Sequence, residues 1–86
     1  MTSTYNASGL RKTSETKDPA WRSQNVTLIR IGAGGSINQA QSLADKRSIV
    51  SQAEDGDCFL LVRRGRFQPD VLWVDNLAVA REALEA

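Results

Sequence analysis

Apolar residues are concentrated in the later part of the chain, where they form short runs separated by turn residues. Only one Val, Ile or Leu, at Leu10, occurs in residues 1–25, whereas residues 26–86 contain seventeen. A segment with so few apolar side chains cannot offset the entropy cost of ordering its backbone, about 1–2 kcal/mol per residue. The pattern therefore predicts a disordered, flexible polar arm over residues 1–24 and a single compact domain over residues 25–86.

Three of the apolar runs are typical of β-strands. Residues 26–31 are rich in β-branched side chains and stop at glycines. Residues 58–62 are apolar at every position, so we expect a central strand that is covered on both faces. Residues 71–74 follow a turn that contains Gly65, and they pair back as a further strand, with Pro69 indicating an edge or bulge at its start.

The glycine-rich stretch Gly32-Ala33-Gly34-Gly35 after the first strand has two interpretations. It resembles the opening of a dinucleotide-binding turn, in which glycines bring the backbone close to a pyrophosphate at a helix N-terminus. The third glycine of that motif would fall at Ile37, and the interpretation requires one long helix over residues 36–54. The alternative is the tip of a β-hairpin, where glycine supplies positive φ.

Helical periodicity favours the hairpin. The apolar stripe of a single long helix would break between Ala44 and Ile49. A helix over residues 43–55, with Ser42 as its N-cap, instead places its apolar positions within one sector of about 120°. These positions are Leu43, Ile49, Val50 and Ala53. Residues 36–41 then form a short return strand.

A final helix is predicted from Leu77 to about Glu85, capped by Asp75 or Asn76. The order of elements is ββαββα, which indicates an α+β fold with a small four-stranded, mostly antiparallel sheet. Because so short a domain buries a small core, a homodimer and a self-sufficient monomer both remain open.

The composition excludes most familiar catalytic machinery. The 86 residues include no histidine and one cysteine, so the chain alone supplies no His-based triad, His/Cys zinc site or internal disulfide. Lys plus Arg number 11 against 10 for Asp plus Glu, and the net charge of +1 gives no overall attraction to polyanions or anionic membranes. No apolar stretch reaches the ~18 residues of a membrane span, and the first residues do not resemble a signal peptide. We therefore expect a cytoplasmic, non-enzymatic protein without cofactor, metal or membrane association.

Two groups that could carry chemistry are better explained structurally. Residues 54–57, Glu-Asp-Gly-Asp, gather three carboxylates that could hold a hard cation, but their spacing matches no known calcium loop. We interpret them as a turn in which Gly56 ends the preceding helix. Cys58 begins an apolar strand and, without a histidine to activate it, is interpreted as a small core side chain.

Two features are candidates for binding. Trp21, in the predicted arm, is either a partner anchor or a cover for the edge of the core. Arg63, Arg64 and Arg66 at a hairpin tip, with Phe67 beside them, could grip phosphates and stack on a base. The alternative for this tip is a solvated turn, since residues 26–86 carry seven basic against eight acidic side chains.

The chain also resembles a bacterial family known as domain of unknown function 3892. The resemblance lies in Val26-Thr27-Leu28-Ile29-Arg30 before a glycine turn and Ser36-Ile37, in Ile49-Val50, Ala53 and Gly56, in Phe59, Leu61 and Val62, and in Arg64-Gly65-Arg66 before the strand at residues 71–74. It covers about 50 of the 86 residues. The resemblance implies a small mixed α/β domain of bacterial origin and no established activity.

These observations predict a small protein-interaction module that uses a flexible N-terminal arm with Trp21 to bind a protein partner. The alternative is a nucleic-acid-binding module that uses the hairpin tip at Arg63, Arg64 and Arg66.

Overall fold

The structure of the protein is a computed structural model that describes residues 10–85. Its elements, in chain order, are β1 (Leu10–Lys12), the 3₁₀ helix η2 (Pro19–Trp21), β2 (Val26–Ile31), β3 (Ile37–Ala40), α1 (Leu43–Ser51), β4 (Cys58–Arg63), β5 (Asp70–Val74) and α2 (Leu77–Glu85). From β2 onward the order is ββαββα, so the predicted α+β fold is confirmed.

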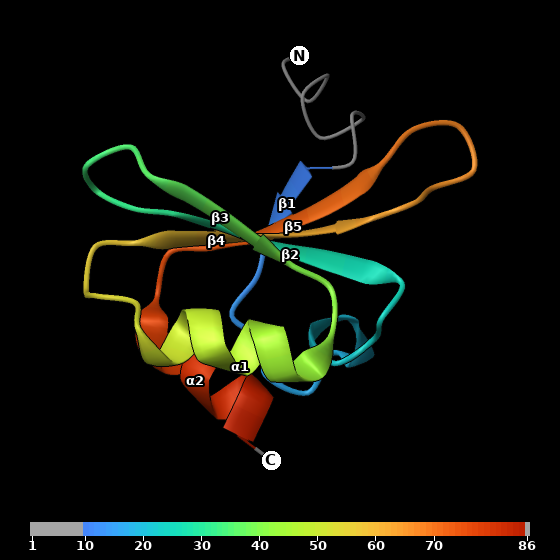
Figure 1. Cartoon of the computed structure of the whole chain (residues 1–86). Coiled ribbons are helices and arrows are strands. Elements are labelled where there is room, and N and C mark those ends of the chain that lie inside the picture. Colours follow the sequence, from blue (N-terminus) through green and yellow to red (C-terminus); the bar gives the residue numbers. More distant parts are fainter. Residues whose placement is uncertain (1–9, 86) are drawn as a thin grey trace.

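The strands form one sheet in the order β1-β5-β4-β2-β3 (Figure 1). The four strands predicted from the sequence pair antiparallel to their neighbours. A fifth strand, β1, adds parallel to β5 at the edge, with Leu10 opposite Val71 and Lys12 opposite Trp73. The sheet is therefore mostly antiparallel, as expected, and one strand wider than predicted.

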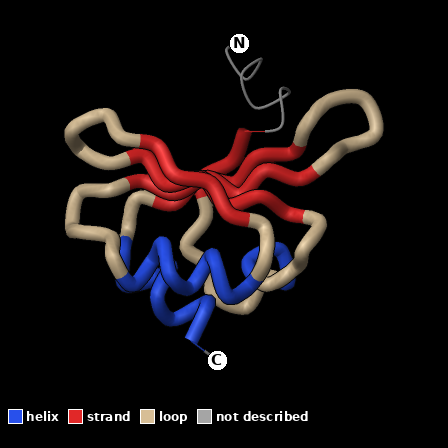
Figure 2. Tube along the Cα trace, viewed as in Figure 1, coloured by secondary structure: helices blue, strands red, loops and turns tan. Residues whose placement is uncertain are grey.

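All described helices lie on one face of this sheet, so the molecule has two layers (Figure 2). Alternate strand residues point into the space between the layers because side chains of a strand alternate between its two faces. Leu28, Phe59, Leu61 and Val74 are 0–1% exposed there. The helices contribute Val50 and the buried side of α2 to the same core.

Residues 10–24 belong to this fold, which corrects the boundary predicted near residue 25. β1 is held by main-chain pairing with β5, which needs no apolar side chains. Farther along, Asp18 caps η2 and Pro19 begins it, and Ala20 and Trp21 are buried in the core. An indole buries more apolar surface than a single Val, Ile or Leu side chain, and a count of Val, Ile and Leu misses it. The rest of the predicted arm, residues 1–9, lies outside the described residues.

The glycine stretch forms the tip of the β2–β3 hairpin, as the periodicity predicts. Ile31 pairs with Ile37, the Gly32 amide donates to the Ser36 carbonyl at 2.8 Å, and Gly35 has a φ of +92°. Because β3 and α1 are separate elements, the single long helix of a dinucleotide-binding turn is absent from this part of the chain.

Helix α1 begins where predicted and ends earlier. The Ser42 hydroxyl accepts from the Asp45 amide at 3.1 Å, but the helix stops at Ser51, four residues before the predicted end. Gly56, with a φ of +97°, lies in a separate turn closed by the Asp57 amide and the Glu54 carbonyl. Helix α2 matches its predicted bounds, and the Asn76 side chain caps it by accepting from the Ala78 amide at 2.9 Å.

Candidate interaction surfaces

The face of the sheet opposite the helices is apolar, and we call it the open face. In β4 the buried Phe59 and Leu61 point toward the helices, so Leu60 and Val62 point away from them. Its described side chains are those of Lys12, Thr27, Ile29, Ile31, Ile37, Gln39, Cys58, Leu60, Val62, Val71 and Trp73. Within residues 10–85 no helix lies on this face (Figure 2).

This arrangement corrects the prediction for the central strand. β4 is the middle strand of the sheet, as expected, but the helices cover only one of its two faces. Leu60 and Val62 are half-buried by their neighbours in the sheet, whereas Phe59 and Leu61 are fully buried. Continuous apolar sequence in β4 therefore reflects a core on one side and an apolar surface on the other.

The strand registers align five open-face residues in one row across the sheet. Leu60 of β4 pairs with Trp73 of β5 and Ile29 of β2. Beyond them, Lys12 of β1 pairs with Trp73, and Gln39 of β3 pairs with Ile29. The row has an apolar centre and polar ends, which is how the core and rim of protein interfaces are composed.

Charge is nearly absent from the open face. Among its described side chains Lys12 is the only Asp, Glu, Lys or Arg. The Lys12 ammonium lies 5.1 Å from the centre of the Trp73 ring and 3.1 Å from the Asp75 carboxylate. The one cation therefore sits at the edge of the sheet, over an aromatic ring and beside a carboxylate.

The predicted arginine tip is the β4–β5 loop, residues 64–69, which extends beyond the end of the sheet (Figure 1). Arg64, Arg66 and Phe67 are exposed, and Phe67 is 93% exposed. Arg63 differs from them because it is the last residue of β4 and forms an ion pair with Asp70 of β5. The structure thus leaves two of the three predicted arginines on the loop with Phe67.

Gly65 sets the path of this loop. The backbone carbonyl of Gln68 passes so close to Gly65 that a Cβ atom there would lie 1.9 Å from the carbonyl oxygen. A side chain at position 65 would therefore move the backbone that presents Arg66 and Phe67.

Trp21 is part of the core and presents no surface to a partner. Its side chain is fully buried, and its indole N–H donates to the Glu15 carbonyl at 2.9 Å. Trp21 is thus a core residue and not a partner anchor, because the segment that carries it folds back under the sheet.

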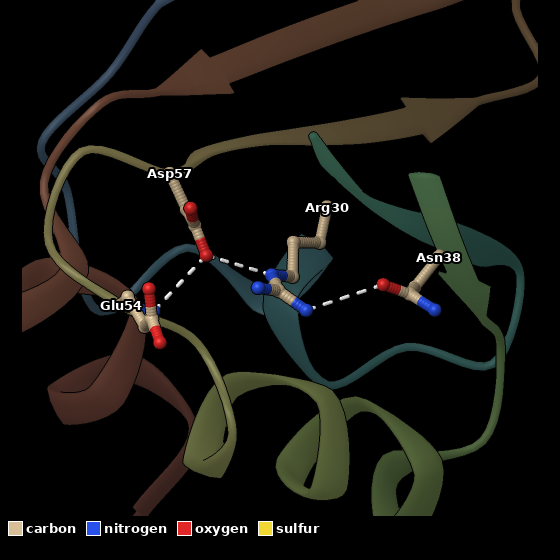
Figure 3. A network of polar contacts seen from close by, with 4 residues as sticks. All are labelled: Arg30, Asn38, Glu54 and Asp57. Carbon is tan, nitrogen blue, oxygen red and sulfur yellow. Dashed lines mark hydrogen bonds and ion pairs between the residues drawn. The ribbon is translucent and has the colours of Figure 1, made fainter. Parts of the chain in front are cut away.

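The Asp57 carboxylate braces the turn that joins α1 to β4 (Figure 3). Asp57 accepts from the Glu54 amide at 3.0 Å and from the Arg30 Nε at 2.7 Å, and Arg30 in turn donates to Asn38 at 3.2 Å. The Glu54 amide and then the Arg30 guanidinium hold the pKa of Asp57 below its usual value. Among residues 10–85 no three His, Cys, Asp or Glu side chains are grouped as metal ligands.

Lys46 is a buried residue that is not among the candidates predicted from the sequence. Its side chain is 0% exposed, and its ammonium donates to the Ser23 carbonyl at 2.6 Å and to the Trp21 carbonyl at 3.3 Å. Burial lowers the pKa of this lysine. A signal was present, because Lys46 lies three residues after Leu43 and four before Val50, on the apolar stripe of α1.

Cys58 lies on the open face, half-buried at the start of β4, and pairs with Ile31 across the strands. It is therefore not the core side chain that its position in the sequence suggests. A lone thiol in this apolar setting adds polarizable, weakly polar surface to the open face.

The described residues also form an open hollow of about 570 Å³ between α1 and α2. Arg47 and Arg81 line it together with Glu85, so an anion there would meet a carboxylate as well as two guanidinium groups. The Arg47 Nε already donates to the Leu84 carbonyl at 2.6 Å. Arg47 therefore has a structural role, because its bond to Leu84 joins α1 to α2.

Neither α-helix of the described residues has the length and apolar character that a bilayer crossing demands. Comparison of the chain with models of known families, with curated proteins and with solved structures finds no match. The resemblance to domain of unknown function 3892 thus stays a prediction. The functional inference rests on the residues of the open face and of the β4–β5 loop.

Proposed function

We propose that the protein is a non-enzymatic protein-interaction module and that a protein partner covers its open face. The observation that carries this proposal is the row from Lys12 to Gln39, whose apolar centre lies on the side of the sheet away from the helices. Removing such a surface from water is favourable by about 25 cal/mol per Å² of apolar area.

The chemistry of the open face favours a protein over other ligands. Small molecules bind in concave sites, and the two hollows described lie between α1 and α2 and at the edge of the sheet, where Lys12 and Asp75 line the second, so neither is at the apolar centre of the open face. Single-stranded nucleic acids need several cations and stacking rings, whereas the described side chains of this face include one cation, Lys12, and one aromatic ring, Trp73. A second apolar protein surface matches it best.

Photo-crosslinking tests this proposal in cells that naturally express the protein. A photoreactive residue replaces Gln39, which is exposed at the rim of the open face, or Ser48, which is exposed on α1. We expect a protein adduct of defined mass from position 39 and none from position 48. Equal yields at both positions, or no adduct at position 39, would contradict the proposal.

A second candidate function is nucleic-acid binding through the β4–β5 loop. The observation that favours it is the 93% exposure of Phe67 directly after the exposed Arg66 and close to the exposed Arg64 in the chain, a combination that suits a stacked base next to phosphates. Arg64 and Arg66 supply the cations, because Arg63 is paired with Asp70.

Salt-dependent binding tests this candidate. Two phosphate contacts predict that log affinity for single strands falls with log salt at a slope of about −1.4. Replacing Arg64 and Arg66 together by Glu should abolish the binding, whereas Arg63→Gln is the matched control and should retain most of it. Absence of binding to RNA, single-stranded DNA and duplex DNA at low salt would exclude the candidate.

A further inference from the structure

We infer that the open face binds a second copy of this chain, with the two sheets packed face to face about a two-fold axis. This inference rests on the proposed function, since it names the protein that covers the open face. Stacked sheets lie about 10 Å apart, with the side chains of their facing surfaces interdigitated. Because the described helices all lie on the opposite side, they leave this approach unobstructed (Figure 2).

The position of Leu60 makes the open face self-complementary. β4 is the third of the five strands, and Leu60 is the middle of its three open-face residues. In a dimer with an axis in the plane between the sheets and through their centre, the central residue meets its own copy. Leu60 would therefore pack on Leu60 of the second copy, with Trp73 and Ile29 on either side.

Charge also permits a second copy. A two-fold interface brings only the residues near its axis against their own copies, so the centre of a face that binds itself needs few charged side chains. Among the described residues of the open face the only charge is that of Lys12, on the edge strand, and Asp75 pairs with it at 3.1 Å. The apolar centre thus meets its copy without repulsion.

The size of the face predicts a weak dimer. Five strands about 4.8 Å apart and about five residues long at ~3.4 Å each give a face of roughly 400 Å². Two copies then cover roughly 800 Å² of flat sheet, with more once side-chain relief is counted, and interfaces below about 1,200 Å² are typical of weak, transient association. Because a second copy carries an identical sheet, its open face has the same width and the same apolar character.

Sedimentation of the full chain from about 1 to about 500 µM tests the inference, because this range brackets the dissociation constants expected of small interfaces. We expect a reversible monomer–dimer equilibrium. Thr27, half-buried on the open face, allows two opposite substitutions at one site. Thr27→Val should tighten the dimer a few-fold, and Thr27→Lys should weaken it by about 10-fold or more, because it places two desolvated cations in the interface.

Two further variants complete the design. Leu60→Lys should abolish the dimer, and circular dichroism checks that it remains folded. Ser48→Lys, on the exposed side of α1, adds the same charge and should leave the equilibrium unchanged. Since Thr27 is already polar, Thr27→Lys keeps the inference testable if Leu60→Lys does not fold.

Each alternative outcome is distinct. A dimer that ignores both Thr27 variants uses another surface, which would overturn the inference. A monomer at all concentrations whose position 39 crosslinks to a different protein overturns the dimer and retains the proposed function, whereas a monomer without such adducts overturns both. A monomer with NMR contacts between residues 1–9 and Trp73 shows that the chain covers its own face, and this also overturns the dimer.

Discussion

A lysine whose ammonium binds two backbone carbonyls joins α1 to the segment that precedes β2. Lys46 donates to the carbonyls of Trp21 and Ser23, and its side chain is 0% exposed. Without a carboxylate among these partners, burial lowers its pKa. The unfolded chain then binds the proton more tightly than the folded one, so the contribution of Lys46 to stability rises with pH toward the pKa of a free lysine.

Lys46→Met tests the two hydrogen bonds while keeping an unbranched side chain. We expect it to lower the free energy of unfolding by about 1–3 kcal/mol, because the buried Trp21 carbonyl and the partly buried Ser23 carbonyl lose their donor. Urea denaturation measures the change, and Lys17→Met, at an exposed position, is the control. A variant as stable as the wild type would show that relief of the buried charge balances the lost bonds.

Asp57 makes the fold sensitive to acid. Its pKa is lowered in the folded state by the Glu54 amide and the Arg30 guanidinium. A carboxylate of this kind contributes stability above its unfolded pKa, near pH 4, and that contribution is lost as pH falls through the lower folded pKa. The turn between α1 and β4 should therefore loosen in acid.

Asp57→Asn removes this dependence. We expect the variant to be less stable than the wild type at neutral pH, with the difference shrinking below about pH 4 as Asp57 of the wild type becomes protonated. Urea midpoints measured across acid and neutral pH give the comparison. A difference that stays constant with pH would show that the carboxylate charge is not what braces the turn.

Gly65 in the β4–β5 loop and Gly34 in the β2–β3 tip differ in the space around them. The β4–β5 loop depends on the close approach of Gln68 to Gly65, whereas a Cβ atom at Gly34, in the β2–β3 tip, meets nothing within 4 Å. Neither residue has a positive φ, so Ala is compatible with the local backbone and only the space around it differs.

Gly65→Ala should lower the free energy of unfolding by more than about 1 kcal/mol and shift the amide resonances of residues 64–69. Gly34→Ala is the matched control, and we expect it to change stability by less than about 0.5 kcal/mol. Urea denaturation and NMR spectra measure both effects. Equal stabilities for the two variants would contradict the close approach at Gly65.

Local patterns predicted the elements well where neighbouring residues determine them. The break in periodicity after Ala44, the cap at Ser42 and the glycine tip follow from short-range sterics and hydrogen bonds. The early end of α1 was not predicted, because Asp57, which shapes the following turn, is held by a hydrogen bond from Arg30 on a strand distant in the sequence. β1 was missed for a similar reason, since its pairing is with β5.

At the scale of the whole molecule, the layers decide what each apolar residue does. The apolar run in β4 reads the same whether helices cover one face or both, so the sequence could not distinguish the open face from a second core. Likewise, Trp21 became a core residue only through the path of residues 13–25. The exposed loop with Arg64, Arg66 and Phe67 was predictable because turns with cations lie at the surface.

A dimer through the open face would also couple stability to concentration. Binding between folded chains favours the folded state, so the melting temperature of the wild type should rise with protein concentration. Calorimetry at several concentrations measures this rise, and Thr27→Lys should reduce it. A melting temperature that is independent of concentration for both proteins would contradict a dimer of folded chains.

The contact from Lys46 to the carbonyls of Trp21 and Ser23 changes where this protein can be cut. Composition alone suggests that the domain could be expressed from residue 25. Such a fragment would lose the Trp21 indole from its core, and the buried Lys46 ammonium would lose both of its acceptors. The polar stretch from residue 10 to residue 24 is thus a structural part of the domain, and N-terminal truncations for crystallisation should keep it.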